Sequence, residues 1–210
     1  MRLIAVTPDL HGQYSGLLKE MHCLRANVFG SRLGWEVTTT GHGERDEYDD
    51  LRPTYILATK SGTVCGSARL LPATGPTMLQ DTFPQLLEEG DLKARAGMIE
   101  SSRFCVDTSL EAGREGHLHL ATLTMFAGII EWSMVNGYSE IVTATDLRFE
   151  RILKRAGWPM TRLGKPVAIG NTMAVAGSLR ADYASFERVR PAGYRSSFSG
   201  IGAASARSAA

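Results

Sequence analysis

Two strand-like segments joined by a tight turn constrain the fold of this chain more than any other feature. The segments TYILAT and TVCGSARLL are rich in apolar residues, and only Lys60, Ser61 and Gly62 separate them. Two such runs with a short, glycine-containing connection are typical of an antiparallel hairpin. The sequence therefore predicts a β-sheet that contains this hairpin, with Arg69 near the end of its second strand.

A third strand is expected in the run MIESSRFCVD, which begins at Met98. In a regular strand Glu100 and Arg103 would lie on opposite faces, because successive side chains alternate. A bulge in this strand would bring both charged side chains toward one cleft.

Helices are expected before and after this third strand. Apolar residues recur at helical spacing from Gly16 to Val28 and, in the longest such pattern, from Leu118 to Val135, where Gly137 supplies a stop. The strand EIVTAT follows, and Asp146 can cap a last helix that runs to Ala156. This order predicts an α/β (α+β) fold with a central mixed, mostly antiparallel sheet flanked by helices, which is the three-layer layout of N-acyltransferases.

The length of 210 residues suits a single domain. We expect that domain to span residues 1–190, followed by a disordered tail rich in Ser, Ala and Gly over 191–210. The formal net charge is +1, so no overall field draws the chain to nucleic acid or to a membrane. The N-terminus lacks a signal-peptide pattern, and no stretch approaches the roughly 18 apolar residues of a membrane span. We expect a cytoplasmic protein, and the sequence leaves its oligomeric state open.

The cysteines argue against a disulfide framework and against a zinc site. Cys23, Cys65 and Cys105 are odd in number and include no close pair. We expect all three to be buried, because free cysteine usually behaves as a small hydrophobic residue. Neither a metal nor a prosthetic group is expected.

The segment from residue 30 to residue 53 is rich in Gly, Thr and charge and shows no sustained period, so we expect a long loop. Its acidic residues would in most proteins form a solvated loop; they are Glu44, Asp46, Glu47, Asp49 and Asp50. Loops of this length in a compact domain are usually functional or disordered. Because the segment also holds Trp35, we favour an active-site wall that becomes ordered around a ligand.

Nine charged and aromatic residues at unusual places carry the strongest functional signal. They are Arg25, Phe29, Trp35, Asp46, Asp49, Arg69, Phe83, Glu100 and Arg103. Such a set could bind a small zwitterion with a positive centre, as S-adenosylmethionine is. Carboxylates favour its sulfonium and ammonium groups, and each ring adds a cation–π attraction of roughly 0.5 to 2 kcal/mol.

The runs that hold these nine residues resemble the acyl-homoserine-lactone synthases, the autoinducer enzymes of quorum sensing. These runs are LRANVFGSRLGW, ERDEYDDLRPTYILA, GSARLLP, DTFPQLL and IESSRFCVD. The resemblance extends from about Ile4 to Gly170, and from Met98 to Arg155 it is especially close to the conjugal-transfer type of rhizobia and agrobacteria. It implies an acyltransferase that moves a fatty acyl group from acyl carrier protein to the amine of S-adenosylmethionine. Lactonisation then releases methylthioadenosine, so S-adenosylmethionine acts as a substrate.

The resemblance also implies roles for individual residues. It assigns S-adenosylmethionine binding to Arg25, Phe29, Trp35, Asp46, Asp49 and Phe83, and it adds Arg69, Glu100 and Arg103 as the catalytic set. Glu100 is the candidate base for the substrate ammonium, and the ordinary alternative is a salt bridge to Arg103 that only orders the strand. Which arginine contacts the ligand and which supports a carboxylate stays open. Backbone N–H groups where strands 99–106 and 140–145 splay apart are the expected oxyanion donors.

The acyl chain and its carrier need further surfaces. Phe104, Met125 and Leu153 could border an apolar passage, although core packing is the usual role of such residues. The resemblance matches Thr143 to a threonine that lies near the C3 carbonyl in family members that prefer 3-oxo chains. Arg148, Arg151 and Arg155 share one face of the last helix. Such a face is usually only solvated, but the resemblance implies that it docks the acidic carrier protein.

Other functions compete with this interpretation. The main alternative is an acyl-coenzyme-A-dependent N-acyltransferase of the same fold. In that case the pyrophosphate loop would fall in DTSLEAGREGH, where Glu111 and Glu115 would face a polyanion. A methyltransferase is disfavoured because no G-x-G pattern follows a first strand. A non-enzymatic sensor of this fold would release no methylthioadenosine.

Overall fold

The computed structural model describes residues 1–33, 37–110, 118–195 and 198. In this part of the chain an eight-stranded sheet forms the centre of the fold, in the order β1-β4-β5-β6-β7-β10-β8, with β9 also paired to β10. Its strands are β1 Arg2–Val6, β4 Thr54–Lys60, β5 Thr63–Pro72, β6 Met98–Val106, β7 Glu140–Asp146, β8 Thr161–Arg162, β9 Val167–Ile169 and β10 Thr172–Arg180. A separate small sheet pairs β2 Thr39–Thr40 with β3 Gly43–Glu44.

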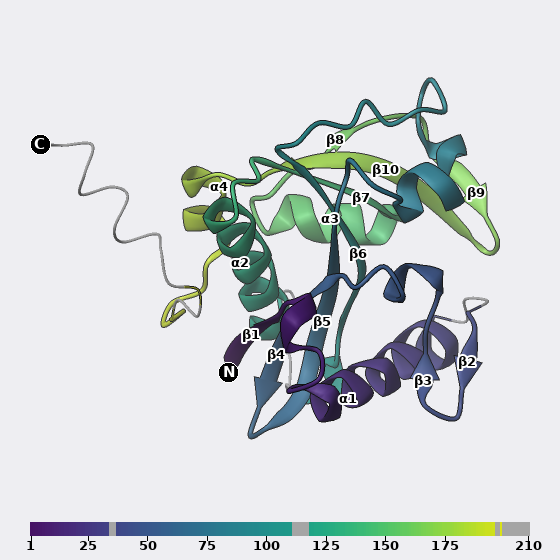
Figure 1. Ribbon diagram of the computed structural model, residues 1–210. Helices are drawn as coiled ribbons and strands as arrows, with labels where there is room; N and C mark the ends of the chain where they lie inside the picture. The colour runs from purple at the N-terminus through teal and green to yellow at the C-terminus, as the bar shows by residue number, and fades with distance from the viewer. Residues whose placement is uncertain (34–36, 111–117, 196–197, 199–210) are drawn as a thin grey trace, which may run out of the picture.

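In the described ranges four α-helices cover the two faces of the large sheet (Figure 1); they are α1 Ser15–Arg25, α2 Leu120–Val135, α3 Leu147–Arg155 and α4 Tyr183–Val189. Alternate residues of β4 point to opposite sides: Tyr55 and Leu57 pack with Met21 of α1, whereas Ile56 and Ala58 join the core cluster of α2. Side chains from α3 and α4 join the cluster of α2 as well. The predicted three-layer fold is therefore confirmed.

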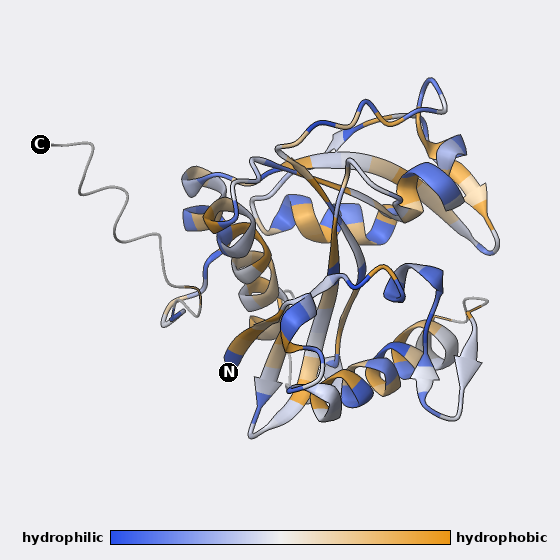
Figure 2. Cartoon of the chain, in the orientation of Figure 1, coloured by the Kyte–Doolittle hydropathy of each residue, from blue (hydrophilic) through white to orange (hydrophobic). Residues whose placement is uncertain are grey.

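Short helical turns of other kinds complete the described elements. Three-residue 3₁₀ turns are η1 Pro8–Leu10, η3 Glu47–Asp49, η5 Pro84–Leu86 and η6 Thr108–Leu110, and the wider π-helical turns are η2 Ala26–Arg32 and η4 Met78–Thr82. Figure 2 shows α2 as largely apolar and α3 as two-sided, with a polar and an apolar face. None of the helices in the described ranges is both long and apolar enough to cross a lipid bilayer.

The predicted hairpin is confirmed, and its turn explains its register. Strands β4 and β5 pair antiparallel, with Lys60 opposite Thr63. The two residues between them, Ser61 and Gly62, have positive φ angles of 53° and 88°. Two positive φ angles define the turn whose twist matches that of the flanking strands.

Among the strands that the structure describes, only β6 and β7 pair in parallel, and this pairing is short. It covers Met98 with Glu140, Ile99 with Ile141 and Glu100 with Val142. Beyond these pairs β6 continues to Val106 and β7 to Asp146. The two strands thus separate where the sequence predicts that they splay.

The segment from residue 30 to residue 53 is more regular than the sequence predicts. Its described part holds the end of η2, the β2–β3 hairpin and η3. The hairpin lies so close to α1 that a β-carbon at Gly43, whose φ is 108°, would come within 2.3 Å of the carbonyl carbon of His22. This close approach fixes the position of the next residue, Glu44.

Two expectations about burial are wrong in part. Cys65 and Cys105 are buried, but Cys23 is exposed, because it lies on the side of α1 that faces away from the sheet. The beginning of the expected tail packs on the protein: Tyr194 donates a hydrogen bond of 2.6 Å to buried Glu131, and Phe198 joins the core cluster of α2. Residues 196–197 and 199–210 lie outside the described residues.

Candidate active site

Six charged side chains form a closed ring on the α1 face of the sheet. Going round the ring, each arginine lies between two carboxylates, in the order Arg25, Asp49, Arg69, Asp46, Arg103, Glu44 and back to Arg25. We call these six residues the charge ring. Three positive and three negative charges balance, which is the condition under which so many charges can be buried together.

Most links of the charge ring are hydrogen-bonded ion pairs. Arg25 holds both carboxylate oxygens of Asp49, at 2.8 and 2.9 Å, and also contacts Glu44. Arg69 holds both oxygens of Asp46 and lies 3.0 Å from Asp49. Such two-pronged contacts fix direction as well as distance, which suits the planar guanidinium group.

Arg103 closes the ring because β6 bulges at this point. Arg69 lies opposite Ser102, and Ser67 lies opposite Cys105. The chain therefore advances by two residues in β5 and by three in β6 over the same length, so β6 has one extra residue here. Arg103 adopts a positive φ of 52° within the bulge. Its side chain thereby reaches Glu44 at 3.0 Å and Asp46 at 2.8 Å. The predicted bulge and the shared face of Glu100 and Arg103 are confirmed.

Asp49 is the most strongly perturbed carboxyl group of the ring. Burial alone would raise its pKa, but the hydrogen bonds and charge of Arg25 and the charge of Arg69 hold that pKa well below its usual range. Tyr55 of β4 donates a further hydrogen bond of 2.7 Å to Asp49, and the backbone N–H of Asp46 donates another. Asp49 is therefore a fixed anion around which the ring is built.

Glu100 stands outside the ring and does not pair with Arg103. Its two oxygens accept hydrogen bonds from the backbone N–H groups of Leu79, at 2.6 Å, and Met78, at 3.2 Å, in η4. Burial raises the pKa of Glu100, and these two bonds and the charge of Arg69 counter part of that rise. A carboxyl group with a raised pKa in a buried site has the properties of a general base.

The aromatic residues of the predicted site divide into three cases. The ring of Phe29 lies under the guanidinium of Arg103, 5.6 Å away. Phe83 follows η4 and packs on Tyr48 and Leu71. Trp35 lies outside the described residues. The structure thus brings Phe29 to the charge ring and places Phe83 beside the turn that holds Glu100.

On the opposite face of the sheet, a small cavity of about 20 Å³, which has room for about one water molecule, lies where β6 and β7 separate. Of the four residues predicted to line an acyl passage, Phe104, Thr143 and Leu153 line this cavity, together with Phe126 of α2 and Trp158. Met125 is fully buried but packs over Gly66 of β5, because it lies on another side of α2 than Phe126. The charge ring and the apolar cavity therefore lie on the two faces of the sheet, on either side of the same gap.

Helix α3 presents the predicted basic face. Asp146 caps it by accepting a hydrogen bond of 2.7 Å from the N–H of Phe149. Arg148, Arg151 and Arg155 are exposed, whereas Leu153 points into the cavity. One short helix thus joins a basic surface to the apolar lining.

Sequence reasoning missed Glu44, which links Arg25 to Arg103 and is fully buried. The sequence places Glu44 in the acidic run of the expected loop but assigns it no role. The signal that could have found it is Gly43, since a glycine next to a carboxylate indicates a close backbone approach.

A sheet that opens between two parallel strands, with helices on both of its faces, is the layout of the N-acyltransferase fold. A solved structure with this fold is that of BjaI, a CoA-dependent acyl-homoserine lactone synthase with SAM and isopentyl-CoA, at a TM-score of 0.80 over 89% of this chain and 86% of that one. Their sequence identity of 23% shows the fold alone. The crystal structure of the AHL synthase LasI matches with a TM-score of 0.77 and 33% identity, over 90% and 93% of the two chains.

The sequence comparisons are more specific. Residues 9–189 match the family described as autoinducer synthase. The acyl-homoserine-lactone synthase of Rhizobium radiobacter is 69% identical over 198 residues, which are 93% of each chain. The chain belongs to the autoinducer synthase family.

Proposed function

We propose that this enzyme makes an acyl-homoserine lactone from S-adenosylmethionine and an acyl thioester carried by acyl carrier protein. The observation that carries the proposal is the gap between β6 and β7, which has the charge ring on one side and the apolar cavity on the other. A zwitterionic amine bound at the ring would meet at this gap an acyl chain that enters the small cavity and widens it by displacing the lining side chains.

The charge ring would bind the methionine portion of S-adenosylmethionine. Asp46 and Arg103 are its partly exposed members, with side chains 10% and 14% accessible, so they are the ones that a ligand can reach. Arg103 can hold the substrate carboxylate, and Asp46 can attract the ammonium and sulfonium groups. Arg25, Asp49 and Glu44 are buried and would hold these two in place.

Glu100 would accept the proton of the substrate ammonium, directly or through one water. The free amine then attacks the thioester carbonyl, and the carrier thiol leaves. The oxyanion of the intermediate would be met by backbone N–H groups of β6 beyond Glu100, where the pairing with β7 has ended. In the second reaction the homoserine carboxylate attacks its own γ-carbon and methylthioadenosine leaves. The protein needs only to hold the substrate in a bent conformation that brings the carboxylate close to this carbon.

The thioester donor would be acyl carrier protein, with Arg148, Arg151 and Arg155 as its docking surface. These exposed cations lie on the helix whose other side lines the acyl cavity, so a carrier bound there can deliver its chain into the cavity. Acyl-coenzyme A is the alternative donor, since the BjaI synthase of similar fold is described as CoA-dependent.

A third part of the proposal concerns the acyl chain. Thr143 lies on β7 in the cavity wall, and its hydroxyl group donates only a long hydrogen bond of 3.4 Å to the carbonyl oxygen of Ala144, which it can exchange for a ketone at C3. We propose 3-oxo acyl chains as preferred substrates on this basis.

Steady-state kinetics of the purified protein tests the donor. Arg151→Glu with Arg155→Glu should raise the KM for acyl carrier protein about tenfold or more and leave the KM for S-adenosylmethionine unchanged. The matched control is Lys60→Glu at the end of β4 with Lys165→Glu between β8 and β9, which makes the same change in net charge away from α3. Equal turnover of wild type with acyl-coenzyme A, or the same rise in the control, would contradict carrier docking on α3.

A further inference from the structure

The turn η4, whose N–H groups hold Glu100, is linked to η3 by one tyrosine. Tyr48 of η3 is 4% exposed, and its ring packs in one apolar cluster with Met78, the first residue of η4. Its hydroxyl group lies 2.7 Å from Oγ1 of Thr82, the last residue of η4. Tyr48 is therefore joined to both ends of the turn that holds Glu100.

The other contacts of Tyr48 lead to the charge ring. Its backbone N–H donates a hydrogen bond of 3.0 Å to Asp46. The guanidinium of Arg69 lies over its ring, 5.4 Å from the ring centre. Asp46 and Arg69 form one of the two-pronged pairs of the charge ring. One residue thus connects the proposed binding site for the methionine portion with the turn that holds the proposed base.

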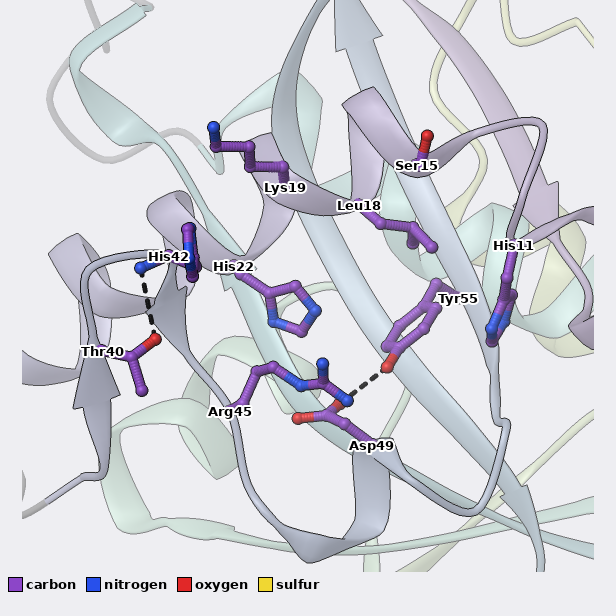
Figure 3. Close-up of a pocket in the computed structure, with 10 residues that line it drawn as sticks. All are labelled: His11, Ser15, Leu18, Lys19, His22, Thr40, His42, Arg45, Asp49 and Tyr55. Carbon is purple, nitrogen blue, oxygen red and sulfur yellow. Dashed lines mark hydrogen bonds between the residues drawn. The ribbon is translucent and has the colours of Figure 1, made fainter.

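Another side of η3 borders a cavity and is held by polar contacts. The cavity has a volume of about 580 Å³, and Asp49 of η3 forms part of its wall (Figure 3). Figure 3 also shows the hydrogen bond that Asp49 accepts from Tyr55 of β4. On this side hydrogen bonds and ion pairs, and not packing, hold η3 in place, so the ring contacts decide where Tyr48 meets η4.

The protonation of Glu100 depends on the position of η4. Burial raises the pKa of Glu100, and the two N–H groups of η4 lower it. Further groups that face Glu100 are the guanidinium of Arg69 and the hydroxyl of Ser102, which also lower this pKa, and Tyr48 from η3. If η4 moved away, the effect of burial would remain and the two hydrogen bonds would weaken, so the pKa of Glu100 would rise.

We propose that Tyr48 is a positioning residue for the acyl-transfer reaction. It holds η4 where the N–H groups of Met78 and Leu79 meet the carboxylate of Glu100, and it ties this position to the charge ring. The hydrogen bond to Thr82 is the part of the link that can be removed alone, because phenylalanine would keep the ring and its contact with the guanidinium. The inference deepens the proposed function and rests on it only for the kinetic test below.

The pKa of Glu100, measured by carbon-13 NMR of the side-chain carboxyl groups, tests the link without an assay of activity. The spectrum of Glu100→Gln assigns the signal. Tyr48→Phe and Thr82→Val each remove one partner of the hydrogen bond. Each should raise the pKa of Glu100 by about half a unit or more, because the N–H groups of η4 would lie farther from the carboxylate. The double variant should shift this pKa no further, since both residues act through one bond.

Tyr194→Phe is the matched control, because it removes a tyrosine hydroxyl that donates to another buried carboxylate, that of Glu131. It should lower the stability of the protein and leave the pKa of Glu100 unchanged. Because Thr82 is exposed, Thr82→Val keeps the test available if Tyr48→Phe folds poorly.

The pH dependence of kcat/KM extends the test to the reaction. In Tyr48→Phe and in Thr82→Val the acid limb should move to higher pH by the same amount as the pKa of Glu100. In Tyr194→Phe the limb should stay where it is in the wild type.

Each other outcome has one meaning. An unchanged pKa of Glu100 in both Tyr48→Phe and Thr82→Val would overturn the link. Additive shifts in the double variant would overturn the hydrogen bond as its route. A shift of equal size in Tyr194→Phe would overturn it as well, because loss of stability alone would then move the pKa. If the pKa rises as expected while the acid limb does not move, Tyr48 positions Glu100, and the proposed role of Glu100 as the base fails.

Discussion

Glu100 has both a structural and a proposed catalytic role. The carboxylate proposed as the base also accepts hydrogen bonds from the N–H groups of Met78 and Leu79 and so holds η4 in place. In Glu100→Gln one of these N–H groups would face an amide NH₂, so we expect a loss of stability of about 1 kcal/mol. Turnover should fall about 10²-fold or more if Glu100 is the base. Urea unfolding and single-turnover kinetics of the same purified variant separate the two effects, and near-normal turnover would exclude the catalytic role.

The raised pKa of Glu100 gives this prediction a second, pH-dependent readout. A base acts only when it is deprotonated, so kcat/KM of the wild type should fall as the pH drops through the pKa of Glu100. Because burial raises that pKa, the fall should begin above the pH range of an ordinary glutamate, near 4.3. A profile that is flat in this range, or that is unchanged in Glu100→Gln, would contradict the assignment.

The proposed preference for 3-oxo chains depends on Thr143. A substitution by valine tests this preference, because valine has nearly the same side-chain volume as threonine. Thr143→Val removes the hydroxyl donor, so a 3-oxo chain should lose roughly 1 to 3 kcal/mol relative to an unsubstituted chain. The ratio of 3-oxo to unsubstituted lactone, measured by mass spectrometry from mixed donors, should fall about tenfold. The same ratio in the wild type and the variant would contradict the proposed role of Thr143. A wild type that makes only unsubstituted lactones would contradict the proposed preference for 3-oxo chains.

Much of the site could be predicted from the sequence because its members fall in recognisable runs. Arg25, Asp46, Asp49, Arg69 and Arg103 do come together, and Phe104, Thr143 and Leu153 share one cavity. The pairing inside the ring could not be predicted, since it depends on the angle at which η3 meets β5. Met125 does not line this cavity, and helical period alone does not say which part of the buried surface of α2 faces the gap.

Helix α3 connects the proposed docking surface to the acyl cavity. Its first turn is stabilised by one N-terminal cap, the hydrogen bond from the N–H of Phe149 to Asp146. Asp146→Ala should cost about 1 kcal/mol of unfolding free energy, whereas Asp146→Asn should cost little, because asparagine caps equally well. Urea denaturation measures both. Since the cap also orders Arg148 and Arg151, the KM for acyl carrier protein should rise in the alanine variant alone. Equal stability of the two variants would show that packing, and not the cap, holds α3.

Across the whole molecule, strand and helix order could be read from the sequence, but the role of the C-terminal segment could not. The composition from Pro191 onward suggests disorder, yet Tyr194 and Phe198 pack on the core. A tyrosine and a phenylalanine among Ser, Ala and Gly give too weak a pattern to outweigh that composition.

Shortening the chain tests this correction. Removal of residues 191–210 should destabilise the protein by more than Tyr194→Phe, which loses one hydrogen bond to a buried carboxylate and should cost roughly 1.5 to 3 kcal/mol. Removal of residues 199–210 only is the matched control and should have little effect. Thermal unfolding of the three variants decides the matter, and equal midpoints for all three would show that the segment is dispensable.

The closed form of the charge ring bears on how such an enzyme can evolve. Replacement of a fully buried arginine or carboxylate of the ring by an uncharged residue leaves an odd charge in a buried place, which is strongly destabilising when one partner of a buried pair is removed. A lineage that removes these charges one at a time therefore passes through poorly folded ancestors. The six positions should be inherited as a block, and changes in substrate should arise first in the acyl cavity, where one side chain can change without its neighbours.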